Sequence, residues 1–341
     1  MNRRTMLSAA AAAVALLFAG YSAYWWMVAG RLEAGLDAWI AAERQAGLVI
    51  DTDRTPIGGY PFTFRATFRH PHVSGQLAGR PIDWQGADVE AWLWPFGLRS
   101  LHLTTTGDHR VTIGADQAAI HVETLNAVLH FDPRGQVSGV AAESGAATIT
   151  LAGNRAVAFQ SASASFAGPA MPPQSDRDPL LQFSLSAAAL KLPADVQLLT
   201  ANPVDALAIQ GTVKGPMPQA PLRQALASWR DAGGIVEISA FSAAQDPLAV
   251  SGSATIALDA DLQPIIAANL AAKGLGPTVD LLAQQKRIAG NDVMKAKLFI
   301  AATEQNAPEG GKQVTSGLTI QNGFLYLGPF KVARIAKIEW P

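Results

Sequence analysis

The histidines are the residues of this 341-residue chain whose chemistry can be tested from spacing. His70 and His72 flank a proline, which could bring two imidazoles near one another. The chain has no HExxH motif and no cysteine, so the usual zinc-ligand patterns are missing. We expect no metal site and interpret the histidines as surface or strand-end residues.

An acid and base pair is the next candidate. His121 and Glu123 would lie on one face of a strand, as an acid and a base do in some active sites, but any strand offers such pairs. The chain has no G-x-S-x-G or G-x-G-x-x-G motif, and Gly310-Gly311-Lys312 lacks the hydroxyl and the earlier glycine of a phosphate loop. We therefore predict that the protein is not an enzyme and binds no cofactor.

Aromatic side chains offer a different kind of site. Trp92 and Trp94 would share a strand face with Asp88 and Glu90. Such aromatics pack either inside a sheet layer or under a helix, or they form a surface that contacts lipid beside the membrane. The candidate apolar ligand surface consists of Phe62, Phe64, Phe68, Trp92, Trp94 and Phe96.

The N-terminal stretch must position the rest of the chain. Residues 5–30 form an uncharged run between Arg4 and Arg31, and about 20 apolar residues suffice to cross a bilayer as a helix. Arg3 and Arg4 predict a cytoplasmic N-terminus. The expected anchor residues are Leu7, Leu16, Leu17, Phe18, Tyr24, Trp25 and Trp26.

A cleaved signal peptide is the alternative interpretation of this stretch, since a basic start precedes an apolar run. The best cut follows Ala23, which puts Tyr21 at the third position before the cut, where a small side chain is required. This misfit and the aromatic end of the run favour an uncleaved anchor.

Composition limits the classes of partner. A net charge of −1 argues against nucleic acid, and charged residues make up only 16% of the chain while apolar residues reach 49%. With no cysteine, the fold has no disulfide and no lipidated-cysteine anchor. The partners expected are a membrane, entered by one helix, and either lipid or another envelope protein.

Alternation of apolar and polar residues after position 48 indicates β-strands. One strand should run from Phe62 to His70, with Phe62, Phe64, Ala66 and Phe68 on one face, and should end at Pro71. Further strands are predicted over residues 88–94, 98–104, 111–113, 120–123, 128–131, 148–151, 157–159, 181–187, 206–213, 235–240, 248–258 and 265–270.

Helical spacing is rarer. It predicts a stalk helix over residues 31–47 and helices from Leu222 to Gly233, over 277–289 and over 291–302, the last with Asn291 as its N-cap. Asn322-Gly323 predicts a hairpin. The fold class is mainly β (α+β): an N-terminal transmembrane helix, then a large antiparallel sheet, curved or sandwiched, with a few covering helices.

The domain organisation follows from these elements. Residues 1–30 would form the cytoplasmic tip and anchor, 31–47 the stalk, 48–167 a first β region, and 168–341 a second β region with helices. The boundary is placed at the proline-rich segment 168–179 (GPAMPPQSDRDP), which no regular element accommodates.

Several short phrases together carry a resemblance: Gly59-Tyr60-Pro61-Phe62, WRDAGG at 229–234, and NGFLYLGP at 322–329. With them the chain resembles the uncharacterised alphaproteobacterial envelope family numbered 2125 among domains of unknown function (DUF2125). Its glycine-rich strands are more loosely similar to AsmA-like envelope proteins, whose β-grooves hold lipid. The resemblance implies a localisation in the cell envelope and a fold, and it supplies no catalytic residue.

Together these patterns predict a single-pass inner-membrane protein with a β-rich periplasmic domain that binds or helps to move a hydrophobic envelope component such as lipid. The alternative is an envelope scaffold that docks a partner protein through a sheet edge or the stalk helix.

Overall fold

A computed structural model describes residues 3–77, 80–169, 171–193, 195–196, 203–307, 310–328 and 330–340. Strands account for 53% of the residues and helices for 23%, and the strand pairings described below are antiparallel, which confirms the mainly β fold. The chain forms two compact units, residues 1–135 with 149–154 and residues 136–148 with 155–341. The domain boundary predicted at residue 168 lies inside the second unit.

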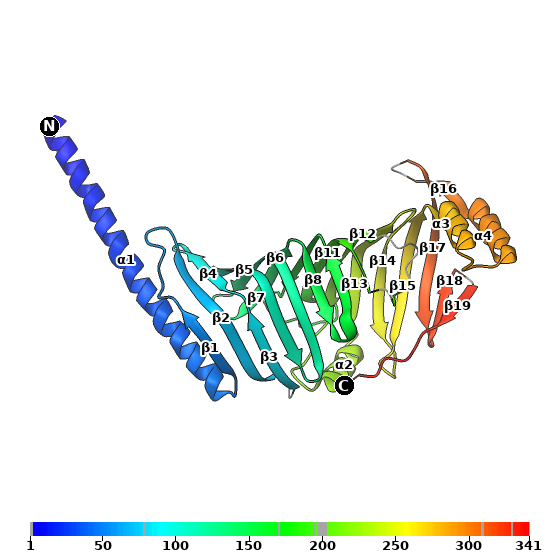
Figure 1. Cartoon of the computed structure of the whole chain (residues 1–341), viewed down its shortest axis with the longest axis horizontal. Helices are drawn as coiled ribbons and strands as arrows, with labels where there is room; N and C mark the ends of the chain where they lie inside the picture. Colours follow the sequence, from blue (N-terminus) through cyan, green and yellow to red (C-terminus); the bar gives the residue numbers. More distant parts are fainter. Residues whose placement is uncertain are drawn as a thin grey trace. The chain divides into compact units, whose positions relative to one another are not determined.

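Helix α1 (Arg3–Gln45) continues without a break from the apolar run into the predicted stalk (Figure 1). Gly47 follows it with φ +97°, a left-handed conformation that glycine adopts readily and that ends helices. The chain can therefore reverse at once into the first strand.

The strands of the first unit pair in the order β1–β2–β4–β5–β6, with β3 also pairing with β2 and β5. The bounds are β1 (Val49–Arg54), β2 (Phe64–Leu77), β3 (Arg80–Gly86), β4 (Val89–Trp94), β5 (Gly97–Ile113), β6 (Asp116–Phe131) and β8 (Ala147–Leu151), followed by the 3-10 turn η1 (Ala152–Asn154).

Strand β2 differs from its prediction at both ends. It begins at Phe64, so Phe62 lies in the preceding turn and does not share a strand face with Phe64. It also continues past Pro71, because an irregularity at His70 (φ +42°) coincides with a register shift against β1, where a proline is tolerated. Before this bend β2 pairs with β4, and after it with β3.

Strands β5 and β6 are each long where two short strands were predicted. The register shifts between Thr105 and Gly107, and Gly107 has φ +92°. This β-bulge interrupts the period-two pattern in the sequence without ending the strand.

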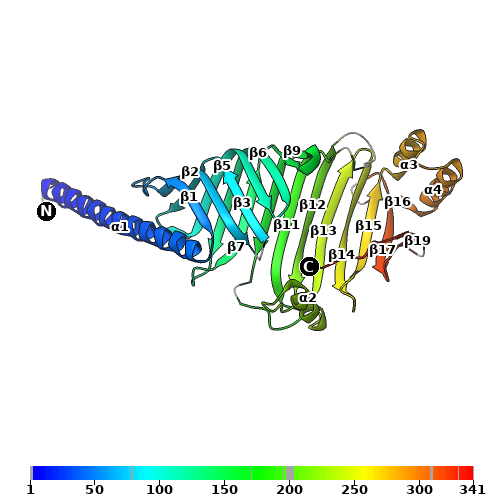
Figure 2. The ribbon, with the colours of Figure 1, turned by 60° about the horizontal axis from the view of Figure 1, so that its bottom comes forward.

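In the second unit, β7, β10, β11, β12, β13, β14, β15, β17, β18 and β19 pair in that order, and β16 adds to β17 (Figure 2). The bounds are β7 (Val137–Ser144), β9 (Arg155–Phe159), β10 (Ser161–Ala167), β11 (Pro179–Leu190), β12 (Val204–Lys214), β13 (Ile235–Gln245), β14 (Leu248–Leu258), β15 (Pro264–Lys273), β16 (Glu304–Asn306), β17 (Lys312–Gln321), β18 (Phe324–Leu327) and β19 (Phe330–Arg334).

Three helices accompany these strands: α2 (Leu222–Asp231), α3 (Leu275–Gln284) and α4 (Gly290–Thr303). The N-cap of α4 is Ala289 instead of Asn291, so the predicted side-chain cap is wrong. The hairpin at Asn322-Gly323 is confirmed, with φ of +53° and +74°, as its turn type requires.

Candidate functional site

Helix α1 is long and apolar enough over Ala12–Gln45 to cross a membrane, a test that a signal sequence also passes. Leu16, Leu17 and Phe18 are exposed, as lipid-facing side chains are when no lipid is present. Leu7 lies in the helix, but its side chain falls outside the described residues.

Trp25 differs from the other expected anchor residues because it belongs to the core of the first unit. Its indole stacks on Phe64 of β2, with ring centroids 5.0 Å apart, and both side chains are almost fully buried. Its Nε1 donates a hydrogen bond to the carbonyl of Thr63 at 3.3 Å. Val28 and Ala29 are buried in the same cluster. The helix therefore becomes part of the body before Gly30.

Two turns of the body contact α1 between Tyr21 and Tyr24, just before this core. In the first, the hydroxyl of Tyr21 donates to the carbonyl of Pro61, and Ser22 and Tyr60 share a hydrogen bond of 2.7 Å. In the second, the ring of Phe96 stacks parallel to Tyr24 at 6.0 Å. The Tyr24 hydroxyl also donates to the carbonyl of Pro95 at 2.6 Å. Both turns hold the helix at the same level.

The candidate apolar ligand surface is divided by the structure. Phe64 is covered by α1, Phe68 is half-buried on the same sheet face, and Phe62 and Phe96 are exposed at the two turns. Trp92 and Trp94 belong to the opposite face, because Trp92 pairs with Arg65 and His102, whereas Phe64 pairs with Leu93. The six residues therefore do not form one surface.

Trp92 stacks on the imidazole of His102, with ring centroids 3.9 Å apart. Burial lowers the pKa of His102, and the charge of His130 lowers it further. This tryptophan is therefore engaged by a neutral histidine on the polar face of the first unit.

The face of the first unit that carries Phe64 is apolar over four strands. Residues that pair directly across antiparallel strands point to the same face, so the registers define its members. Its apolar members are Phe64, Ala66 and Phe68 of β2, Val89, Ala91 and Leu93 of β4, Leu101 and Leu103 of β5, and Leu125, Ala127 and Leu129 of β6, and Thr105 of β5 lies among them. Apart from Phe64 and Ala66 these residues are only half-buried.

His109 extends this face along β5. Its ring stacks on Trp84 of β3, with centroids 6.2 Å apart, and its Nε2 lies 3.3 Å from the Thr105 hydroxyl. Burial lowers the pKa of His109 more than the charge of Asp108 raises it. The neutral imidazole is the form that suits this apolar setting.

The second unit has an apolar face that is more extensive, and we call it the apolar face of unit 2. Leu185, Ile209 and Phe241 stand in one cross-strand row, and the neighbouring rows repeat the pattern. Its larger members are Leu181, Phe183, Leu185, Leu207, Ile209, Val213, Val236, Ile238, Phe241, Val250, Ile256, Ile266, Leu270, Val314, Leu318 and Ile320.

The reverse face of the same strands is polar. Gln182, Thr212, Glu237, Thr255 and Thr319 occupy one of its rows. A sheet with one apolar and one polar face ordinarily packs the apolar face against another layer.

Among the described residues, no second layer covers the apolar face of unit 2. Only Ile238 and Val314 among its larger members are buried, and Leu207 is 41% exposed. Figures 1 and 2 show α2 at one end of the strands and α3 with α4 at the other, so these helices lie beside the face and not over it.

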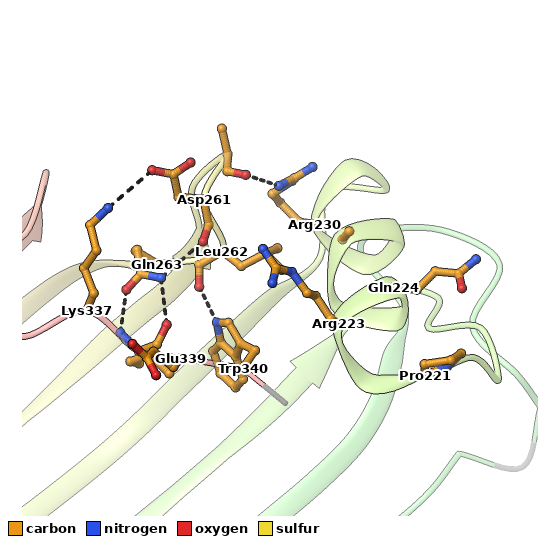
Figure 3. A pocket seen from close by; sticks show the side chains of 13 residues that line it. Pro221, Arg223, Gln224, Arg230, Asp261, Leu262, Gln263, Lys337, Glu339 and Trp340 are labelled. Atoms are coloured by element: carbon orange, nitrogen blue, oxygen red, sulfur yellow. Dashed lines mark hydrogen bonds and ion pairs between the residues drawn. The ribbon is translucent and has the colours of Figure 1, made fainter.

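A polar pocket of about 970 Å³ lies at the end of the strands near α2 (Figure 3). Gln263 forms two hydrogen bonds with the backbone of Ile338, of 2.8 and 3.1 Å, and Trp340 donates to the carbonyl of Leu262 at 2.8 Å. Arg230 of α2 donates to the carbonyl of Ala260 at 2.8 Å. These contacts attach the C-terminal segment to a turn. Arg223 is a further cationic side chain that lines the pocket.

The histidines with candidate chemistry lie on strands and at strand ends. His121 pairs with Asp108 at 2.7 Å instead of with Glu123, and His72 pairs with Asp83 at 2.8 Å. Among the residues described, no three His, Asp or Glu side chains gather as a metal site would require. His70 and His72 do not converge on a common partner, because His70 lies 3.6 Å from Asp88.

The apolar face of unit 2 is the feature that our sequence reasoning missed. The signal was present in the alternation of residues 181–187, 206–213 and 248–256, which we used only to predict strands. Finding the face also requires the register between strands, because a shift of one residue moves a side chain to the other side.

The likeness to AsmA-like proteins stays a prediction. No curated protein and no solved structure matches the chain. One family model matches residues 25–336, which include all nineteen strands of the structure described here. The chain therefore belongs to the family described as "Uncharacterized protein conserved in bacteria (DUF2125)".

Proposed function

We propose that the protein is a single-pass inner-membrane protein whose β-rich periplasmic body binds, or helps to move, a hydrophobic envelope component such as lipid. The observation that carries the proposal is the apolar face of unit 2, which has a polar reverse face and no covering layer among the described residues. Apolar surface of this extent marks a site of contact with an apolar ligand, a membrane or a partner.

We favour lipid as the occupant because the chain includes a helix, α1, that would lie in a bilayer. Helix α1 enters the core of the first unit through Trp25, so this unit would stand directly beside the bilayer in which the helix would lie. Acyl chains need no directed hydrogen bonds, and the larger members of the face are aliphatic or aromatic with no charged residue among them.

An uncleaved α1 is part of the proposal. The helix is continuous through residues 20–24, where the signal-peptide alternative requires a cut. Removal of the residues up to Ala23 would also delete Tyr21 and its hydrogen bond to Pro61. These contacts support an uncleaved helix, and the mass of the protein isolated from membranes tests this directly.

Site-specific photocrosslinking in cells tests lipid binding. A benzophenone amino acid replaces Leu207 on the apolar face or Ala206, the adjacent exposed residue on the polar face of the same strand. Cells are grown with ³²P-phosphate to label phospholipids and then irradiated. We expect radiolabelled protein from position 207 and little from position 206.

Equal labelling at the two positions, or none at either, would refute lipid binding by this face. The pair Ile266 and Ala267 of β15 repeats the comparison on another strand, because neighbouring residues again point to opposite faces. Agreement between the two strands excludes an effect peculiar to one position.

An envelope scaffold is the second candidate function. Trp39 is an exposed aromatic residue on the stalk part of α1, and aromatic residues of this kind anchor protein partners. Benzophenone at position 39 should give a protein adduct of discrete mass if the scaffold alternative holds. A dominant protein adduct at position 207 would likewise favour the scaffold over lipid transfer.

The proposal assigns no catalytic activity to the protein. His121 is engaged by Asp108, and both His121 and Glu123 are exposed on a strand. Cells that carry His121→Ala with Glu123→Ala should retain the function of the protein, and loss of function with normal protein levels would contradict this assignment.

A further inference from the structure

The two turns that contact α1 form an aromatic group around the helix, which we call the collar. It consists of Tyr21, Tyr24 and Trp26 of α1, Tyr60 and Phe62 of the first turn, and Phe96 of the second. Tyr60 stacks on Trp26 at 6.2 Å, and Phe96 lies 5.9 Å from Tyr21 and 6.0 Å from Tyr24. The collar therefore joins three segments of the first unit at one level of the helix.

The collar presents aromatic rings outward. Phe62 is 74% exposed and Phe96 is 85% exposed, although both stand at turns that hydrogen bonds fix to the helix. Residues 55–63 and 91–98, which contain these turns, include no charged residue. Exposed phenylalanines on uncharged turns are unfavourable in water and favourable at the boundary of a membrane.

The length of the helix places the membrane boundary at the collar. From Arg4 to Tyr24 the helix rises about 30 Å at 1.5 Å per residue, which equals the thickness of the hydrocarbon core of a bilayer. Beyond Tyr24, Trp25 and Ala29 are buried against the body and are not available to lipid. The span therefore ends at the collar and not at Gly30.

We propose that the collar is a membrane-contact surface, with Phe62 and Phe96 inserted among the lipid headgroups and upper acyl chains where α1 leaves the bilayer. The first unit would then contact the membrane at three points, α1, Phe62 and Phe96, and would not be joined to it by a flexible linker alone. The β2 and β4 ends of its apolar face, marked by Phe64 and Leu93, would begin at the bilayer surface.

The absence of cysteine makes single-cysteine labelling the direct test. The full chain with Phe62→Cys or Phe96→Cys is labelled with a nitrobenzoxadiazole dye and reconstituted into vesicles of phosphatidylethanolamine and phosphatidylglycerol. Asp116→Cys is the matched control, because Asp116 is the exposed first residue of β6 and pairs with Ile113, at the end of the 17-residue strand β5 about 55 Å from its start. These side chains are exposed, so the substitutions leave the core intact.

We expect the dyes at positions 62 and 96 to emit at shorter wavelength than the dye at position 116. Lipids with a nitroxide near the headgroup should quench them at least threefold more than the control, and aqueous iodide should quench them less. Dyes at 62 and 96 that behave like the dye at 116 would overturn the inference.

This inference rests on the proposed anchor, and flotation of the vesicles separates the two. A chain that does not float with the vesicles refutes the anchor and the collar together. A chain that floats while positions 62 and 96 remain open to iodide refutes the collar alone. Lipid crosslinking at position 207 is measured independently of either result.

Discussion

The indole of Trp25 lies against the ring of Phe64 with 26° between the ring planes, and the two side chains are 0% and 1% exposed. One of them belongs to the apolar N-terminal helix and the other to the first residue of β2. The helix expected to act only as an anchor is therefore also a core element of the first unit.

Replacing Trp25 or Phe64 by alanine should destabilise the first unit by about 3–5 kcal/mol, the usual cost of deleting a large buried aromatic side chain. The measurement is denaturant unfolding of the full chain in detergent micelles, followed by tryptophan fluorescence for Phe64→Ala and by circular dichroism for both variants. Phe62→Ala is the control and should change the free energy of unfolding by less than about 1 kcal/mol, because Phe62 is exposed. Equal effects of Phe62→Ala and Phe64→Ala would contradict the packing described.

Gly252 lies under the Phe241 ring on the apolar face of unit 2. A Cβ at this position would lie 2.0 Å from the carbonyl oxygen of Asn269 and 3.0 Å from the Phe241 ring. Gly252→Ala should therefore lower the free energy of unfolding by about 1–3 kcal/mol. Gly317 of β17 has no atom within 4 Å of the corresponding position, so Gly317→Ala should have almost no effect. The comparison is made by thermal unfolding, and an unaffected Gly252→Ala protein would show that the strands do not have this register.

His109 should make the first unit sensitive to acid. Its folded-state pKa is lowered from the ordinary value of 6.5, so below about pH 6.5 the unfolded chain binds this proton more readily than the folded chain does. The free energy of unfolding should be constant for this group above that pH and should fall as the pH decreases through it. His102 contributes in the same direction, because its pKa is also lowered.

The test compares denaturant midpoints of the wild-type chain and His109→Gln at pH 8 and pH 5. The variant cannot bind the proton, so it should lose less stability than the wild type between the two values. His121→Gln is the matched control, because His121 of β6 is exposed on the opposite face of the sheet. An identical pH dependence of His109→Gln and the wild type would exclude His109 as a source of the acid sensitivity.

Gln263 should control the exposure of the C-terminal segment. Gln263→Ala removes both hydrogen bonds to Ile338, and at about 0.5–1.5 kcal/mol each their loss should increase local opening about tenfold. Trypsin should then cut after Lys337 faster, as peptide mass spectrometry can follow. Gln224→Ala alters the same pocket without removing these bonds and serves as the control. Similar cutting rates in the two variants would show that the segment is not attached as described.

The sequence was sufficient where the signal is local. The strand at Leu248–Leu258 was predicted with its observed bounds, and Asn322-Gly323 predicted its hairpin, because alternation and turn chemistry depend only on neighbouring residues. Local signals failed at Pro71 and at Gly107, where bulges carry the chain through residues that ordinarily end strands.

The sequence by itself determined that the chain starts with an apolar helix of spanning length and continues as antiparallel β structure without disulfides. Only the tertiary structure decided that Trp25 packs into the body, that Trp92 and Phe64 point to opposite faces, and that Leu185, Ile209 and Phe241 align in one uncovered row. The physical reason is register. The alternation of apolar and polar residues gives each strand two different faces, but pairing with distant strands decides which apolar faces combine into one surface and which of them remain uncovered.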